Sequence, residues 1–209
     1  MSAASRAPLR PTAWIRSRRA VLTTAGAAAA ALLVSACGSG GVSGGSGDTK
    51  FIMGKDGIST VEKGKRDAAP DLSGRTIDDK ELALSSFKGK VVVLNVWGSW
   101  CSPCRAEAPN FQKVSADLKS KGVQFVGINV ADPQVKSAVA FEEQFGVTYP
   151  SLYDPSSKLM LRFKKGTLNP QAIPSTLVLD REGRIAARSL AALSEEKLRS
   201  MIDPVLAEK

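Results

Sequence analysis

The stretch N-V-W-G-S-W-C-S-P-C-R-A-E-A-P, Asn95–Pro109, places two cysteines two residues apart. It begins inside a run of β-branched residues, Lys90–Trp97, and leads into a segment with helical spacing of apolar residues. A Cys-x-x-C pair at such a strand-to-helix junction has three ordinary uses. It can cross-link the fold, supply half of a metal site, or exchange electrons with other thiols.

The cysteine and histidine content favours the redox use. The chain has three cysteines and no histidine, so a Cys/His zinc site and a Ser-His-Asp or Cys-His catalytic pair are excluded. A tetrahedral zinc site needs four ligands, and Cys101 and Cys104 supply two. A disulfide that closes so short a loop stabilises a fold far less than one that closes a long loop. We therefore interpret Cys101 and Cys104 as a redox-active dithiol, for which no cofactor or metal is expected.

The position of the pair predicts different roles for its two thiols. Cys101 falls at the N-terminus of the expected helix, where free backbone N–H groups and the helix dipole stabilise a thiolate. A fall in the pKa of a cysteine from about 8.5 to about 7 raises its thiolate fraction at neutral pH from a few per cent to about half. Cys104 lies in the first turn, where it is shielded. We expect Cys101 to attack substrate disulfides and Cys104 to resolve the mixed disulfide.

Two neighbours of the pair are further candidates, each with a plain structural alternative. Trp100 is expected to form an apolar wall beside the nucleophile, and the alternative is an ordinary core tryptophan. Glu107 follows Cys104 by three residues, so the two side chains share a helix face. Its carboxylate can take a proton from Cys104 during resolution, and the alternative is an exposed glutamate on the helix surface.

The hydrophobic pattern predicts an α/β fold with a mixed central sheet, helices on both faces and an N-terminal β extension. The run over 90–97 is typical of a central strand buried on both faces. A helix is expected over 104–118, a strand over 123–130, and a helix from Asp132 that stops at Gly146. The remaining expected elements are strands at 51–53, 150–153, 176–180 and 185–188, a preceding hairpin and turn within 69–72 and 82–90, a short helix over 156–163, a hairpin turn at 181–183, and a final helix opened by Ser194.

The first fifty residues have the composition of an export signal and a tether. An arginine pair, Arg18-Arg19, runs into an Ala-rich apolar stretch that ends at Val34-Ser35-Ala36-Cys37. We expect residues 1–36 to be a twin-arginine-like export signal, with a lipobox at 34–37 that directs lipidation of Cys37. General export remains open, as does an uncleaved anchor, although the stretch is short and polar for a span of roughly 20 residues. Residues 37–50, rich in Gly and Ser, are expected to be a flexible tether to a domain over 51–209.

The positive charge does not indicate nucleic-acid binding. The formal net charge is +9, but five arginines of the leader supply five of these charges, and basic and acidic residues are interspersed elsewhere. A basic stripe interleaved with aromatic residues, which single-strand binders use, is absent from the sequence. We therefore expect no nucleic-acid partner.

The motif as a whole resembles the thioredoxin superfamily, and within it the membrane-tethered TlpA/ResA-like thiol-disulfide oxidoreductases. The resemblance runs from about Pro70 to the C-terminus. It rests on Leu94-Asn95, on W-x-x-W-C-x-x-C-x-x-E-x-P (Trp97, Trp100, Cys101, Cys104, Glu107, Pro109) and on Ile173-Pro174-Ser175-Thr176.

The resemblance implies roles for several residues. Cys101 matches the family's nucleophile, Cys104 its resolving thiol and Glu107 the glutamate that tunes these thiols in ResA-like members. Pro174 matches the family's cis-proline opposite the Cys pair, and Ile173 the residue whose backbone hydrogen-bonds the substrate chain. Asn95 stands where cytoplasmic thioredoxins carry a buried aspartate. Because Asn95 cannot act as a base, more weight falls on Glu107.

We therefore interpret the chain as a lipid-anchored, extracytoplasmic and monomeric oxidoreductase that reduces or exchanges disulfides of exported proteins. Ser102-Pro103 lacks the histidine that strong oxidants of the superfamily carry within the pair, which favours a reductant or moderate exchanger. By analogy, a CcdA-type membrane thiol-electron carrier recharges the pair, and apocytochrome c is one client. Two alternatives are a peroxiredoxin-like peroxidase, disfavoured because Gly98 replaces the expected Thr or Ser, and a redox-inert binding lipoprotein. A Sco-type copper carrier is disfavoured because it needs a histidine ligand.

Overall fold

The computed structural model describes residues 50–208. The expected export signal, the lipobox with Cys37 and nearly all of the tether lie outside the described residues. Within residues 50–208, no helix is both long and apolar enough to cross a membrane.

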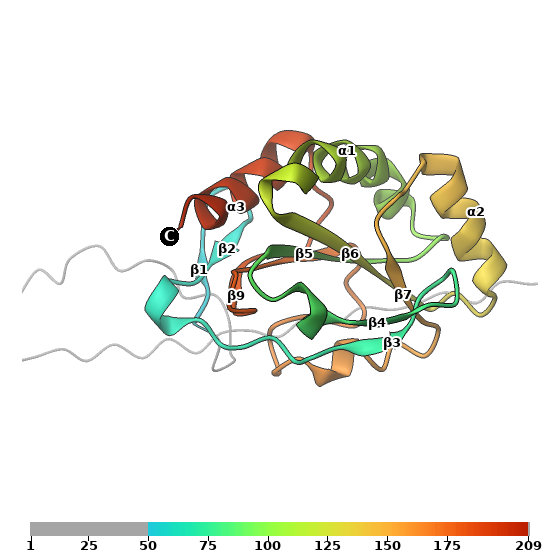
Figure 1. The fold of residues 1–209 in the computed structure, drawn as a ribbon, viewed down its shortest axis with the longest axis horizontal. Coiled ribbons are helices and arrows are strands. Elements are labelled where there is room, and N and C mark those ends of the chain that lie inside the picture. The colour runs from blue at the N-terminus through green and yellow to red at the C-terminus, as the bar shows by residue number, and fades with distance from the viewer. Residues whose placement is uncertain (1–49, 209) are drawn as a thin grey trace, which may run out of the picture. The chain divides into compact units, whose positions relative to one another are not determined.

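A mixed seven-stranded sheet, in the order β1-β2-β9-β8-β5-β6-β7, forms the centre of the described part of the chain (Figure 1). β5 pairs in parallel with β6 and antiparallel with β8, and β6 pairs in parallel with β7. All residues of β5 are buried, as its β-branched run predicts for a strand covered on both faces. The strands of this sheet are Ile52–Met53 (β1), Ser59–Thr60 (β2), Val91–Trp97 (β5), Val123–Val130 (β6), Ser151–Asp154 (β7), Ser175–Leu179 (β8) and Ile185–Ser189 (β9).

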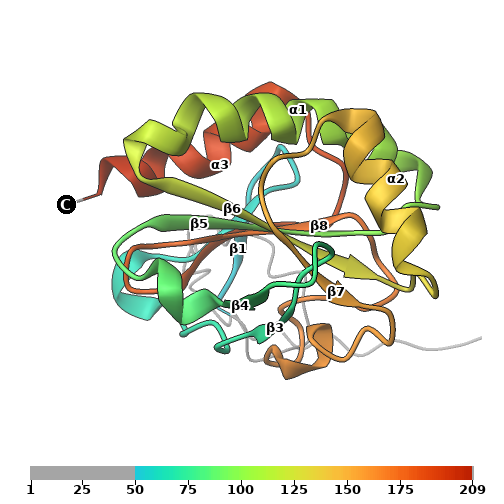
Figure 2. The ribbon, with the colours of Figure 1, turned by 45° about the vertical axis from the view of Figure 1, so that its right-hand side comes forward.

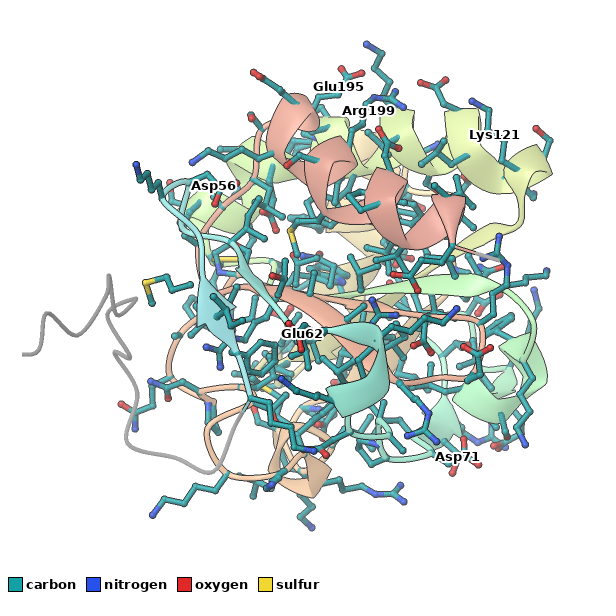
Figure 3. All side chains as sticks on the ribbon, turned by 90° about the vertical axis from the view of Figure 1, so that its left-hand side faces the viewer. Asp56, Glu62, Asp71, Lys121, Glu195 and Arg199 are labelled. Carbon is teal, nitrogen blue, oxygen red and sulfur yellow. A yellow bond between two sulfur atoms is a disulfide. The ribbon has the colours of Figure 1, made fainter. Side chains whose placement is uncertain are left out.

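Two long helices, α1 (Ser102–Leu118) and α3 (Glu195–Ala207), lie side by side over one face of the sheet (Figure 2). Phe111 of α1 and Leu198 of α3 are buried in one hydrophobic cluster with Val93 of β5. Figure 3 shows Glu195 and Arg199 next to each other on α3, where their side chains form an ion pair at 2.9 Å. The third long helix, α2 (Val135–Phe145), packs Phe141 on Trp97 of β5, with ring centroids 4.2 Å apart.

The other face of the sheet is covered by shorter elements. The hairpin of β3 (Ser73–Arg75) and β4 (Glu81–Ala83) lies below the sheet in Figure 2. Two 3-10 turns, η2 (Leu84–Phe87) and η4 (Met160–Arg162), add Leu84 and Met160 to the cluster on this face. The mixed sheet with helices is thus confirmed, but on this face, where helices were also expected, the cover consists of short 3-10 turns and a hairpin. Two further 3-10 turns are η1 (Lys63–Lys65) and η3 (Lys119–Lys121).

Local signals explain most element boundaries. Ser194 caps α3, because its side chain accepts a hydrogen bond from Lys197 N. Gly146 ends α2 with φ +61°, a left-handed conformation that glycine adopts without steric cost. These boundaries confirm the sequence-based prediction.

Three expectations need correction. The short helix expected over 156–163 is a single 3-10 turn, η4, because the Asp154 carboxylate binds the N–H groups of Lys158 and Leu159 and holds this segment as a capped turn. The hairpin before the central strand pairs 73–75 with 81–83 and does not include 69–72 as a strand. Helix α2 starts at Val135 instead of Asp132, because the Asp132 carboxylate bonds elsewhere.

Candidate active site

The Cys101–Cys104 pair forms a disulfide at the N-terminus of α1, with Cα atoms 5.2 Å apart. Cys101 is the N-cap residue, and its Sγ accepts a hydrogen bond from Cys104 N at 3.2 Å. In the reduced protein, a thiolate in this position accepts the same backbone donor and faces the positive end of the helix dipole. Both residues are buried, with Cys101 4% and Cys104 1% exposed. In the disulfide form Cys101 is thus only slightly more exposed than Cys104.

Glu107 lies one helical turn after Cys104 and is buried, with 2% exposed. Its Oε1 accepts a hydrogen bond from Asn95 Nδ2 at 2.8 Å, and its Oε2 accepts one from Leu193 N at 2.9 Å. The alternative of a solvent-exposed surface glutamate is therefore wrong. The spacing on α1 was sufficient to put Glu107 on the face of Cys104, but the covering loop at Leu193 comes from 86 residues further along the chain.

Burial raises the pKa of Glu107 from 4.5 to about 7, against the effect of its hydrogen bonds from Leu193 and Asn95. A carboxylate in water is ionised at neutral pH, whereas this one is present in both protonation states. A general acid–base group works best when its pKa lies near the operating pH. Glu107 therefore combines a buried position on the Cys104 face with the ability to take or return a proton.

Trp100 lies on the surface, with 60% of the residue exposed, so the alternative of a core tryptophan is wrong. Its indole Nε1 donates a hydrogen bond to Ala131 O at 3.1 Å. A Cβ on Gly98 would come within 2.8 Å of the same Nε1, so the glycine leaves the space in which the ring edge lies. Trp100, directly before Cys101 in the chain, therefore presents an exposed apolar ring.

The Ile173–Pro174 peptide bond is cis, as the family resemblance implies for Pro174. Pro174 is buried, and the half-buried Ile173 packs against the hydrophobic cluster that contains Cys101 and Cys104. Ile173, 69 positions after Cys104 in the sequence, is thus brought to the cluster that contains the disulfide.

One site residue is absent from the sequence-based set. Asp132 is 2% exposed and accepts hydrogen bonds from Ser99 N at 2.9 Å and Ser99 Oγ at 2.6 Å. The available signal is an aspartate just after a buried strand, a pattern that equally predicts the start of a helix.

The fold and site agree with the comparisons to known proteins. The Redoxin family matches residues 64–205. The thioredoxin-like protein YneN of Bacillus subtilis is 30% identical over 147 residues, which are 68% of this chain and 80% of the relative. The thiol-disulfide oxidoreductase ResA of Geobacillus kaustophilus is 29% identical over 137 residues, or 66% of this chain and 75% of the relative.

Solved structures give the same result. A secreted thiol-disulfide isomerase from Corynebacterium glutamicum is 32% identical with a TM-score of 0.68, and the match covers 78% of this chain and all of that one. A DsbF homologue from Corynebacterium diphtheriae is 34% identical with a TM-score of 0.66, covering 72% and 94%.

The chain therefore belongs to the Redoxin family and has a thioredoxin fold. Within the thioredoxin superfamily it is a ResA-like protein, and its Cys-x-x-C disulfide makes it an enzyme of the protein-disulfide oxidoreductase type.

Proposed function

We propose that this oxidoreductase works outside the cytoplasm and reduces or exchanges disulfides in exported proteins through Cys101 and Cys104. The observation that carries the proposal is the disulfide at the N-terminus of α1 with the buried Glu107 one turn behind it. The location is supported by the export-signal pattern of residues 1–36 and by the similarity to a protein described as secreted.

The proposed reaction transfers two electrons in two exchange steps. The Cys101 thiolate attacks one sulfur of a client disulfide; that S–S bond breaks, and the other client sulfur leaves as a thiolate that takes up a proton. Deprotonated Cys104 then attacks Cys101 Sγ, the mixed disulfide breaks, and the second client thiolate leaves. The client is reduced, and the enzyme returns to the Cys101–Cys104 disulfide.

Glu107 is proposed to accept the Cys104 proton in the second step. Its position on the Cys104 face of α1 and its pKa of about 7 support this role. Asn95, which donates to Glu107 Oε1, cannot act as the base and instead holds the carboxylate in place.

Three residues around the disulfide are proposed to bind the client chain. Trp100 offers an exposed aromatic surface, and large aromatic residues dominate binding energy at protein interfaces. Ile173 packs against the hydrophobic cluster that contains Cys101 and Cys104, and Pro174 follows it through a cis peptide bond. We propose that the backbone of Ile173 hydrogen-bonds the client as a short β-type pairing.

The remaining proposals concern the membrane. Cleavage within the pattern at 34–37 and lipidation of Cys37 would leave residues 37–50 as the tether of the domain over 51–209, which acts as a monomer. A CcdA-type membrane thiol carrier is proposed to reduce the disulfide again by the reverse exchange. Apocytochrome c, whose haem-attachment thiols must stay reduced, is proposed as one client.

Insulin reduction driven by dithiothreitol tests the activity of the full-length protein in mild detergent. We expect turnover that is abolished by Cys101→Ser, and a Glu107→Gln variant that is slowed about 10²-fold at the resolution step. Turnover independent of Cys101 would refute the proposal and favour the redox-inert alternative. Oxidation that depends on peroxide would instead favour the peroxidase.

Trapping in cells tests the choice of clients. Cys104→Ala removes the resolving thiol, so clients should remain attached to Cys101 as mixed disulfides that dithiothreitol releases. Cys101→Ala is the matched control, because it keeps Cys104 and loses the attacking sulfur. Equal trapping by both variants would contradict the assigned roles.

A further inference from the structure

We propose that Asp132 is a positioning residue for client binding, an inference that rests on the proposed function. Its buried carboxylate fixes the turn Gly98–Trp100, and the adjacent Ala131 carbonyl fixes the Trp100 indole, so that a rigid aromatic surface stands beside Cys101. Asp132 does not touch the reacting sulfurs, and its effect is exerted through Trp100.

The Asp132 carboxylate is fully engaged with donors from two segments. Oδ1 accepts from Ser99 Oγ at 2.6 Å, and Oδ2 accepts from Ser99 N at 2.9 Å and from Asn129 Nδ2 at 2.6 Å. Hydrogen bonds to a charged acceptor are about twice as strong as neutral ones. The carboxylate therefore joins the end of β6 to the turn that immediately precedes Cys101.

The segment that carries Asp132 is itself held. Tyr153 Oη donates to Asp132 O at 2.9 Å, which ties the segment to β7. Ala131 adopts φ +54°, a left-handed conformation that residues other than glycine adopt at a cost. Such a conformation persists where surrounding contacts enforce it, and here it accompanies the carbonyl's bond to Trp100 Nε1 at 3.1 Å.

The turn is fixed from its other side as well. Cys101 N donates to Gly98 O at 3.1 Å, and Arg105 Nη1 of α1 donates to Ser99 O at 3.3 Å. Gly98 leaves room for the indole, since a Cβ there would lie 2.8 Å from Trp100 Nε1. The result is a side chain that is 60% exposed but anchored at its one polar atom.

This arrangement is what a preorganised binding surface requires. Ordering one mobile side chain at an interface weakens binding by up to about tenfold. Trp100 is already ordered before the client arrives, so this cost is removed. Loss of the Asp132 contacts should therefore weaken client binding and leave the intrinsic reactivity of Cys101 unchanged.

Kinetics of the reduced full-length protein in mild detergent test the inference, with insulin as protein client and oxidised glutathione as small disulfide. We expect Asp132→Ala to lower kcat/KM for insulin about tenfold through KM, with no change in the rate with glutathione. Asp132→Asn keeps an oxygen for the two N–H donors and an amide that Ser99 Oγ can accept from, so it should restore activity to within about threefold. Asp154→Ala is the matched control, because Asp154 is similarly buried at the end of β7 and binds two backbone N–H groups away from the turn.

A double-mutant comparison decides whether Asp132 acts through Trp100. Trp100→Ala should lower kcat/KM for insulin at least tenfold, and adding Asp132→Ala to it should cause no further loss, because coupled residues are not additive. Trp100→Phe keeps an aromatic ring but cannot donate to Ala131, and should reproduce the loss even if Asp132→Ala does not fold.

Three results would each overturn the inference. The losses in kcat/KM for insulin could multiply in the double variant, or Trp100→Phe could stay within threefold of wild type. Asp132→Ala and Asp154→Ala could also lose kcat/KM equally. Failure of the proposed function looks different. In that case the unmodified protein reduces neither insulin nor oxidised glutathione.

Discussion

Replacing Glu107 by glutamine should change how stability depends on pH, by an amount that follows from the burial of this carboxyl. Its pKa in the fold is about 7, against an ordinary value of 4.5. Below pH 4.5 the carboxyl is neutral in both the folded and the unfolded chain and contributes nothing. Above pH 7 it is ionised in both, and its burial then lowers the free energy of unfolding. A difference of about 2.5 in pKa corresponds to roughly 3 kcal/mol.

Glutamine carries no charge at any pH, so Glu107→Gln removes this penalty. The free energy of unfolding of the variant minus that of wild type should therefore rise by roughly 3 kcal/mol between pH 4.5 and pH 8. The sign is unusual: a conservative change at a candidate catalytic position becomes more favourable for stability as the pH rises. It is the trade-off expected where a site keeps a destabilising group for function.

Urea unfolding of the oxidised proteins at several pH values between 4.5 and 8 measures this difference. The oxidised form is used because the disulfide-bonded cysteines do not titrate, and other titrating groups, such as Glu142, cancel between variant and wild type. Glu143→Gln makes the same chemical change on an exposed side chain and should stay within about 0.5 kcal/mol throughout. A difference for Glu107→Gln that stays flat within 1 kcal/mol would refute the assigned burial effect.

The remaining predictions concern stability and are checked by the same unfolding measurements. Gly127→Ala should lower the free energy of unfolding by about 1–3 kcal/mol, because its Cβ would lie 2.2 Å from Ser151 Oγ and 2.7 Å from Trp97 Nε1. The control Gly64→Ala, whose Cβ meets nothing within 4 Å, should stay within about 0.5 kcal/mol of wild type. Equal losses at the two glycines would contradict the close contact at Gly127. Arg66→Ala should cost about 3–5 kcal/mol, since Arg66 pairs with the buried Asp180 at 3.0 Å and leaves that charge uncompensated when removed; a loss below 1 kcal/mol would show that the pair is not held as described.

Local patterns in the sequence were sufficient for the thiol chemistry and for most of the sheet. The β-branched run of β5, the Cys-x-x-C pair and the helical spacing after it are contiguous, so the junction that places Cys101 at a helix N-terminus follows from neighbouring residues. Gly146, which ends α2, and Ser194, which begins α3, act on residues only a few positions away. The prediction of a short helix over 156–163 was wrong, because a single side-chain cap by Asp154 outweighs the weak helical pattern of this segment.

Tertiary structure decided what surrounds the disulfide. Spacing put Glu107 on the face of Cys104, but its burial, and with it the pKa of about 7, depends on the loop at Leu193, 86 residues away. The contact between Asp132 and Ser99 spans 33 residues, and the Trp100 indole bonds to Ala131 O across 31 residues. Desolvation and hydrogen-bond satisfaction are set by atoms that come together only when distant strands pair. The sequence by itself therefore determined that the Cys-x-x-C pair lies at the N-terminus of α1, and the packing of the sheet determined the burial, the proton affinity and the hydrogen-bond partners of the groups around it.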